Sequence, residues 1–129
     1  MDGFDVWSLI KQKTHNQGKS PYFEPSQIWW VQFGQNIATE IHGKGEQFLR
    51  PAVILTRMYT NACLVVPLTS VVKEGDYYFN FVDTFGTSQC AKLPQVRYID
   101  GKRLKYQISS IRLEDFDALK EAFCLLIKK

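Results

Sequence analysis

The stretch from Gly34 to Ser70, GQNIATEIHGKGEQFLRPAVILTRMYTNACLVVPLTS, combines a long glycine-rich loop with two apolar segments. The apolar segments read PAVILT from Pro51 and ACLVVP from Ala62, with a short turn between them. Continuous apolar runs of this length predict strands that are buried on both faces. We therefore expect both strands to lie in the interior of the protein.

One arginine and two hydroxyl groups stand at the ends of these strands. Arg50 precedes the first strand, and Thr69 and Ser70 follow the second. A guanidinium fork matches the oxygens of a phosphate group, and hydroxyls can donate to the same oxygens. No cluster of metal-ligand residues accompanies them in the sequence. The pattern predicts a site for phosphate chemistry without a metal, or for phosphate binding alone.

Other segments predict further short strands and two helices. The apolar spacing of Phe4, Trp7 and Ile10 predicts a short amphipathic helix. The predicted elements are helices over Phe4–Thr14 and Leu113–Lys128, strands over Gln27–Phe33, Tyr77–Val82, Ser88–Leu93, Gln95–Ile99 and Tyr106–Ile111, and a helical turn over Lys102–Lys105. Many short strands and a closing helix indicate an α+β fold built on a small, strongly curved antiparallel sheet or half-open barrel.

The C-terminal helix has one apolar stripe, formed by Phe116, Leu119, Phe123 and Leu126, which we expect to pack against the sheet. The first segment, residues 1–20, is expected to be a helical extension that covers the barrel. Cys63 and Cys124 lie within apolar runs and are expected in the core. The cysteine pattern predicts neither a disulfide framework nor a zinc site.

Whole-chain properties favour a single soluble domain. The chain has 129 residues and a net charge of +3, with 12 basic and 8 acidic residues from Arg50 onward against 4 and 5 before it. This mild positive excess favours a polyanionic ligand but is common in proteins that bind none. No signal segment or apolar run of membrane-spanning length occurs, so we expect a cytoplasmic protein with no membrane partner.

Four segments in a fixed order resemble the MazF/PemK toxins of bacterial toxin–antitoxin systems. The segments are NIATE from Asn36, GKGEQFLRPAVIL from Gly43, PLTS from Pro67 and QVRYIDGKRL from Gln95. The resemblance extends from about Gln27 to the C-terminus. It implies an SH3-like barrel and a homodimer that cleaves single-stranded RNA sequence-specifically without a cofactor. Such enzymes leave 2′,3′-cyclic phosphate and 5′-hydroxyl ends, and a cognate antitoxin silences them.

The resemblance also implies roles for particular residues. It assigns catalysis to Arg50, Thr69, Ser70 and Glu40. We further predict RNA contacts from the polar and basic residues of the loop and of the later strands. These are Asn36, Thr39, His42, Lys44, Lys73, Gln95 and Arg97.

The physical role of Arg50 is expected to be charge stabilisation of the phosphorane, with protonation of the leaving oxygen as a further possibility. An arginine is a poor general base because its free pKa exceeds about 12. Glu40 and His42 are the two candidates for accepting the proton, although the simpler interpretation of His42 is a solvated loop histidine without a catalytic role.

Two positions depart from the family pattern and affect the expected RNA sequence preference. Ala38 stands where many members have glycine, which predicts a stiffer loop. Pro94 stands where a serine or an acidic residue is usual, which removes a polar contact near Gln95.

Two other functions are compatible with the same kind of barrel. The first is a module that binds RNA or protein without cutting it. The second is a gyrase-directed toxin similar to CcdB, a family that acts through C-terminal residues including a terminal tryptophan. The present chain ends in CLLIKK without tryptophan, which argues against the gyrase hypothesis.

Overall fold

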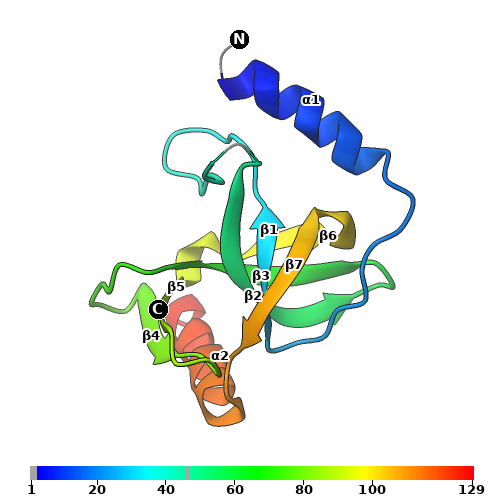
Figure 1. Ribbon diagram of the computed structural model, residues 1–129. Coiled ribbons are helices and arrows are strands. Elements are labelled where there is room, and N and C mark those ends of the chain that lie inside the picture. The colour runs from blue at the N-terminus through cyan, green and yellow to red at the C-terminus, as the bar shows by residue number, and fades with distance from the viewer. Residues whose placement is uncertain (1–2, 46) are drawn as a thin grey trace.

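The computed structural model describes residues 3–45 and 47–129, which form two helices, seven strands and two single turns of 3-10 helix (Figure 1). The helices are α1 (Gly3–His15) and α2 (Leu113–Ile127). The strands are β1 (Gln27–Gln32), β2 (Leu49–Met58), β3 (Ala62–Thr69), β4 (Tyr78–Val82), β5 (Ser88–Lys92), β6 (Arg97–Asp100) and β7 (Leu104–Ser110). The 3-10 turns are η1 (Leu93–Gln95) and η2 (Gly101–Arg103).

The strands form one antiparallel sheet in the order β4-β5-β3-β2-β1-β7, and β6 pairs with β3 outside this path. The two apolar segments of the sequence, β2 and β3, are therefore neighbours near the middle of this order. The expected α+β fold with a curved antiparallel sheet is confirmed, and the sheet is not closed into a full barrel.

Side chains and single backbone bonds, rather than a strand ladder, join the two edges of this sheet at one end. The Asp83 carboxylate, just after β4, accepts a hydrogen bond from the Ser109 hydroxyl of β7 at 2.9 Å. The amide of Thr84 donates to the carbonyl of Ser110, also at 2.9 Å. Because β4 and β7 are opposite ends of the strand order, these bonds show that the sheet curls back on itself.

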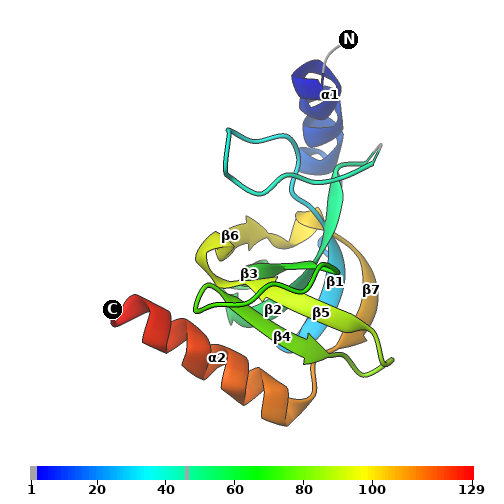
Figure 2. The same ribbon diagram turned by 90° about the vertical axis from the view of Figure 1, so that its left-hand side faces the viewer.

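The central strands bury both faces, because alternate side chains of a strand point to opposite sides. Ala52 and Ile54 of β2 lie in one core cluster, and Val53 and Leu55 lie in the other. The second cluster includes Phe116 and Leu119 of α2, so the predicted stripe packs against the sheet (Figure 2). The rest of that stripe, Phe123 and Leu126, is partly buried against the same cluster.

The cysteines differ from the expectation at one position. Cys63 is buried, and its burial raises the pKa of its thiol to about 12. Cys124 is exposed, so its placement in the core was wrong. Its helical position faces away from the stripe that contacts the sheet, and an apolar run alone does not reveal that direction.

Neither described helix is long and apolar enough to span a membrane.

Helix α1 lies at the opposite end of the molecule from α2 (Figures 1 and 2). Its buried residues are Trp7 and Thr14, which are seven apart and therefore share one face. Phe4 is 55% exposed, so the apolar spacing of Phe4, Trp7 and Ile10 does not mark the face that the helix buries. The sequence predicted the helix itself. It did not show which face is buried, because that depends on the part of the protein against which the helix packs.

The loop between β1 and β2 is ordered by its own backbone hydrogen bonds. The amide of Gly43 donates to the carbonyl of Gly34 at 2.8 Å, and Lys44 and Leu49 bond to each other in both directions. Gly43 lies against the Phe48 backbone, where an added Cβ would fall only 1.6 Å from the carbonyl oxygen. The glycine is thus required by a close approach of two chain segments.

The variant Gly43→Ala is expected to destabilise the protein by about 1–3 kcal/mol, because the loop backbone must move to admit the methyl group. Thermal and urea unfolding of the variant would measure the effect. Gly18→Ala is the matched control, since nothing lies within 4 Å of an added Cβ there. Equal unfolding midpoints for the two variants would contradict the close approach.

Candidate functional site

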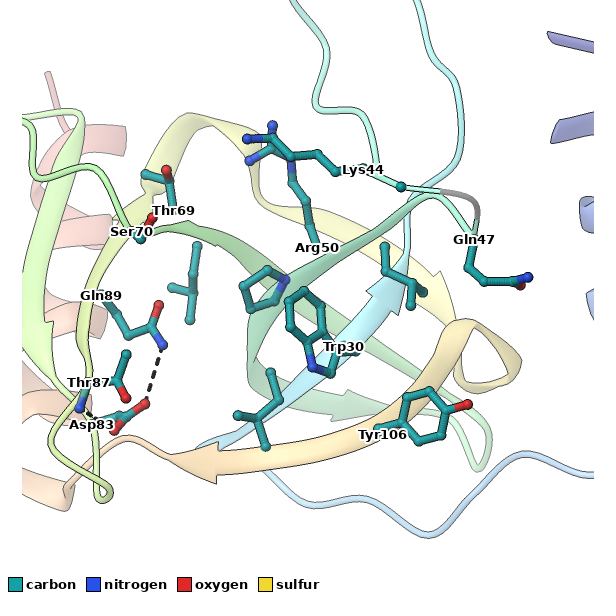
Figure 3. A pocket seen from close by; sticks show the side chains of 15 residues that line it. Trp30, Lys44, Gln47, Arg50, Thr69, Ser70, Asp83, Thr87, Gln89 and Tyr106 are labelled. Carbon is teal, nitrogen blue, oxygen red and sulfur yellow. Dashed lines mark hydrogen bonds between the residues drawn. The ribbon is translucent and has the colours of Figure 1, made fainter. Parts of the chain in front are cut away.

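A cavity of about 830 Å³ opens where the C-terminal end of β3 meets the N-terminal end of β2 (Figure 3). Its walls come from the β1–β2 loop, five strands and the turn after β4. The lining residues are Trp30, Lys44, Gly45, Gln47, Leu49, Arg50, Pro51, Leu68, Thr69, Ser70, Asp83, Thr87, Gln89, Tyr106 and Ile108. The cavity therefore brings together Arg50, both hydroxyl residues and one of the predicted RNA-contacting lysines.

Arg50 lies inside β2 rather than before it, paired with Val31 of β1. Its Nε donates a hydrogen bond to the carbonyl of His42, which fixes the plane of the guanidinium against the loop. Its two terminal nitrogens have no hydrogen-bond partner among the described residues. Partial burial lowers the pKa of the guanidinium below its ordinary value. A fixed fork with two free donors is suited to a phosphate group.

Thr69, the last residue of β3, and Ser70, which follows it, lie at the other side of the same cavity (Figure 3). The Thr69 hydroxyl oxygen accepts a hydrogen bond from the amide of Val71 at 3.3 Å, which leaves its proton available to donate outward. The Ser70 side chain makes no hydrogen bond to a described residue. Both hydroxyls can therefore donate to a ligand in the cavity.

Four cations gather around this end of the sheet: Lys44, Arg50, Lys73 and Lys92. Burial lowers the pKa of Lys92, and the charges of Arg50, Lys73 and Lys44 lower it further. None of the four forms an ion pair with a residue in ranges 3–45 and 47–129. A cluster of unneutralised cations favours a polyanionic ligand. We refer to these four residues as the cation cluster.

Lys92 was missed by the sequence analysis. It ends β5, and Cys90, two residues earlier on the same strand, pairs with Thr69 across the sheet. In the sequence, the only indication of this residue was that it is a lysine near the end of a predicted strand. The strand order that brings β5 beside β3 is needed to place it near Arg50.

The apolar part of the cavity is formed by aromatic and aliphatic side chains. Trp30 pairs with Pro51 of β2 and with Tyr106 of β7, so the three side chains share a face. Trp30 is 39% exposed, whereas its neighbour Trp29 is 7% exposed and belongs to the core. An exposed tryptophan beside a tyrosine offers flat surfaces on which nucleobases stack.

Asp83 also lines the cavity, and its buried carboxylate accepts four hydrogen bonds. Asp83 accepts from the amides of Phe85 and Thr87 and from the side chains of Gln89 and Ser109. Its desolvation raises the pKa, but these hydrogen bonds, with that from Thr87 the strongest, outweigh the burial and lower it. Asp83 is thus an ionised structural group whose acceptor capacity is already used.

A second cavity of about 380 Å³ contains most of the remaining predicted residues. Its lining residues are Asn36, Glu40, Ile41, Pro94, Gln95, Val96 and Arg97. Glu40, assigned to catalysis in the sequence analysis, therefore does not line the cavity that contains Arg50. Its carboxylate accepts a hydrogen bond from the amide of Ile37 within its own loop, at 2.9 Å.

Several predicted RNA contacts hold the loop in place. The Gln95 amide accepts from Ile41 at 3.1 Å and donates to the carbonyl of Thr39 at 3.0 Å. The Asn36 side chain donates to the carbonyls of Phe33 and Ile41. Thr39 participates here through its backbone. These amides are already bonded within the protein, and so their first role is to order the loop.

The Arg97 side chain also makes its contacts within the protein. One terminal nitrogen donates to the carbonyl of Phe33 at 3.3 Å, and the guanidinium lies 5.9 Å from the Phe33 ring centre. Burial lowers its pKa, and the charge of Glu40 opposes that shift. Arg97 and Glu40 are therefore the charged pair of the second cavity.

His42 lies in the chain between Ile41, which lines the second cavity, and Lys44, which lines the first. Its Nδ1 accepts a hydrogen bond from the amide of Asn36 at 2.7 Å, and its Nε2 lies 3.3 Å from the carbonyl of Ala38. An accepting Nδ1 implies the neutral tautomer with a proton on Nε2. The ring of His42 is thus occupied with the loop, while its carbonyl orients Arg50.

Ala38 stands at φ +50°, in the left-handed region that glycine adopts most readily. Its backbone therefore has the geometry of a glycine position. The expected stiffening of the loop at this residue has a physical basis, because a side chain in this region restricts the backbone.

A family model described as PemK-like, MazF-like toxin of type II toxin–antitoxin system matches residues 24–127. This match covers most of the chain and both cavities. The chain belongs to the PemK-like, MazF-like toxin family. The matched region of this family member begins just before β1, so helix α1 lies outside it.

Solved structures of other toxins have the same fold as this family member. MazF from Deinococcus radiodurans aligns with a TM-score of 0.68 and 17% identity, over 87% of this chain and 100% of that one. A mycobacterial endoribonuclease solved in complex with its cognate antitoxin aligns with a TM-score of 0.65 and 9% identity, over 83% and 96% of the two chains. The Mycobacterium tuberculosis toxin MazF-mt6 gives 0.60 and 19%, over 79% and 96%. None of the curated proteins compared with the sequence matches it.

Proposed function

We propose that this toxin-family member is an endoribonuclease that cleaves single-stranded RNA without a metal ion. One observation carries the proposal. The free donors of Arg50 and the hydroxyls of Thr69 and Ser70 line one open cavity, and unneutralised cations surround it. The family membership and the endoribonuclease among the structural neighbours support the same activity.

The chemistry that suits this donor set is transphosphorylation. The 2′-oxygen of a ribonucleotide attacks the adjacent phosphorus and loses its proton, while the bond from phosphorus to the 5′-oxygen of the next nucleotide breaks. The 5′-oxygen takes up a proton, which gives a 2′,3′-cyclic phosphate and a 5′-hydroxyl. No water or cofactor enters this step, and so the protein needs to align the 2′-oxygen and stabilise the phosphorane.

Arg50 is proposed to bind the nonbridging oxygens through its two terminal nitrogens. Because its Nε is bonded to the His42 carbonyl, the fork is oriented before the RNA arrives. Thr69 and Ser70 add hydroxyl donors from the opposite wall. The depressed pKa of Arg50 also makes this guanidinium a better proton donor to the leaving 5′-oxygen than a solvated arginine.

The two cavities suit neighbouring nucleotides of one strand. In the first, Trp30 and Tyr106 offer stacking surfaces for bases. In the second, Glu40 can accept from base N–H groups, and Arg97 can donate to base oxygens through its remaining nitrogens. We therefore propose that Glu40 contributes to base recognition rather than to proton transfer.

A cognate antitoxin and a homodimer complete the proposal. The structural neighbours include a mycobacterial endoribonuclease in complex with its cognate antitoxin and two crystal forms of MazE–MazF from Deinococcus radiodurans. An antitoxin that neutralises this protein is expected to carry an acidic segment, because the cation cluster lies around the larger cavity. Size measurement of the purified chain, alone and with such a partner, would test both expectations.

Cleavage in EDTA is the decisive experiment for this function. A mixed single-stranded RNA incubated with the protein and excess EDTA is expected to be cut, with new 5′ ends that a polynucleotide kinase can label directly. The direct labelling identifies 5′-hydroxyl ends. If EDTA abolishes cutting, the metal-independent mechanism is wrong. If RNA binds saturably and stays intact, the protein is an RNA-binding module of the same fold.

A further inference from the structure

Helix α1 contacts the β1–β2 loop through one tryptophan. The ring of Trp7 occupies the space that a side chain at residue 34 would need, since a Cβ added to Gly34 would lie 2.1 Å from the ring. The ring centre of Trp7 is 5.5 Å from that of Phe48, which is itself buried near the end of the loop. On another side, the guanidinium of Arg103 lies 5.7 Å from the Trp7 ring centre.

A chain of hydrogen bonds makes a second connection from the same helix to the loop. The Lys105 ammonium donates to the Thr14 hydroxyl at 3.3 Å, and that hydroxyl donates to the side-chain oxygen of Gln32. The Gln32 amide in turn donates to the Gln47 carbonyl at 3.1 Å. Because Gln32 is 1% exposed, this chain replaces hydration of a buried amide and fixes its orientation.

The contacted loop segments are bonded to the segment that orients Arg50. The Phe48 carbonyl accepts from the amides of Phe33 and Gly34, and the Gly34 carbonyl accepts from the amide of Gly43. The residue before Gly43 is His42, whose carbonyl receives the Arg50 Nε. Trp7 is thus separated from the guanidinium of the candidate site by one packed glycine and a few backbone bonds.

The loop needs external support because it buries few apolar side chains of its own. Among the described residues of the loop, the buried hydrophobic ones are Phe33, Ile41 and Phe48. Glycines at 34, 43 and 45 increase the conformational freedom that the loop loses on ordering. The outer face of α1 is exposed, with Leu9 56% exposed. Its buried face contacts the loop through Trp7, and the end of the helix is also held at η2, where the Lys102 ammonium donates to the His15 carbonyl at 3.1 Å.

We propose that α1 is a buttress of the β1–β2 loop, by which we mean that its packing holds the loop in the conformation that orients Arg50. Trp7 is then a positioning residue for Arg50. This inference rests on the proposed nuclease function for its kinetic consequence. The family model begins at residue 24, so the buttress is an addition to the part of the chain that defines the family. It acts through the loop, without contact to RNA.

The variants Trp7→Ala, Trp7→Phe and Phe4→Ala test the proposal. Phe4→Ala is the matched control, because it removes an exposed aromatic side chain from the same helix. Amide hydrogen exchange would compare the loop amides of Gly43, Lys44 and Leu49 with those of β3. RNA cleavage by the same variants would give kcat and KM separately.

Trp7→Ala is expected to accelerate exchange in the loop while β3 remains protected, and to lower kcat about 10- to 100-fold with a smaller change in KM. Trp7→Phe should restore much of both, and Phe4→Ala should match the wild type. Loop exchange in Trp7→Ala equal to that in Phe4→Ala would overturn the proposal. A uniform loss of protection that includes β3 would overturn it too, because Trp7 would then be an ordinary core residue. The exchange measurement needs no RNA. If the wild-type protein does not cleave RNA, the proposed nuclease function is contradicted, but the exchange rates still show whether α1 holds the β1–β2 loop in place.

Discussion

Arg50→Ala is expected to reduce RNA cleavage by about a hundredfold to a thousandfold or more. Removing one preorganised donor to a developing negative charge typically costs about 3–4 kcal/mol of the activation barrier. Arg50 provides two such donors and a full charge in a partly buried position. Arg50→Lys should recover little, because an ammonium keeps the charge but lacks the planar fork. Single-turnover cleavage of a defined RNA oligonucleotide would measure both variants.

The control for this prediction is Arg112→Ala, which removes an exposed arginine that donates to the Val82 carbonyl and does not line the cavity that contains Arg50. It should retain cleavage. Arg50→Ala also loses the bond to the His42 carbonyl, so circular dichroism and thermal unfolding must show that the fold persists. A folded Arg50→Ala protein with wild-type cleavage would eliminate the proposed site.

Asp83→Ala is expected to lower the free energy of unfolding by about 3 kcal/mol or more. The change removes a charged acceptor and leaves several buried donors without a partner. It also releases the link to Ser109 that holds the two sheet edges together. Urea unfolding would measure the effect. Asp117→Ala is the control, because that carboxylate is exposed and forms only a surface ion pair with Lys120.

The same carboxylate predicts how stability depends on pH. Its folded pKa is lower than its unfolded value of about 3.9, so its stabilisation is complete above pH 4 and is lost as the pH falls through the folded pKa. Asp83→Asn has nearly the same shape but does not titrate. The stability difference between wild type and Asp83→Asn should therefore shrink as the pH falls below about 4. A difference that stays constant with pH would show that the charge of Asp83 contributes nothing.

Local sequence signals predicted the elements of the fold well. The apolar runs of β2 and β3 and the stripe of α2 were sufficient, because burial imposes those patterns directly. The segment Gln95–Ile99 was less predictable. It was expected to be one strand, but Gln95 ends the turn η1 and the strand β6 starts at Arg97. Pro94 favours such a turn. The residues after it have high strand propensity, and they masked the boundary between the turn and the strand.

The candidate site was predictable in part. Arg50, Thr69 and Ser70 could be expected together because they end neighbouring strands, and the structure places all three on one cavity. The separation of Glu40 from that cavity was not predictable, because it depends on how the long loop between β1 and β2, residues 33–48, folds. Loop side chains such as those of Gln95 and Asn36 can bind either the ligand or the backbone, and only the three-dimensional path decides between them.

The sequence by itself determined which strands and helices form, which strands lie in the interior, and that a guanidinium and two hydroxyls stand at strand ends. These features follow from neighbours a few residues apart and from the tendency of apolar surface to leave water. Only the tertiary structure decided that Lys92 joins the cation cluster, that Asp83 links the sheet edges, and that Trp7 supports the loop of Arg50. Each of these depends on contacts between residues distant in the chain, whose partners are selected by the curvature of the sheet and the shape of the packed loop.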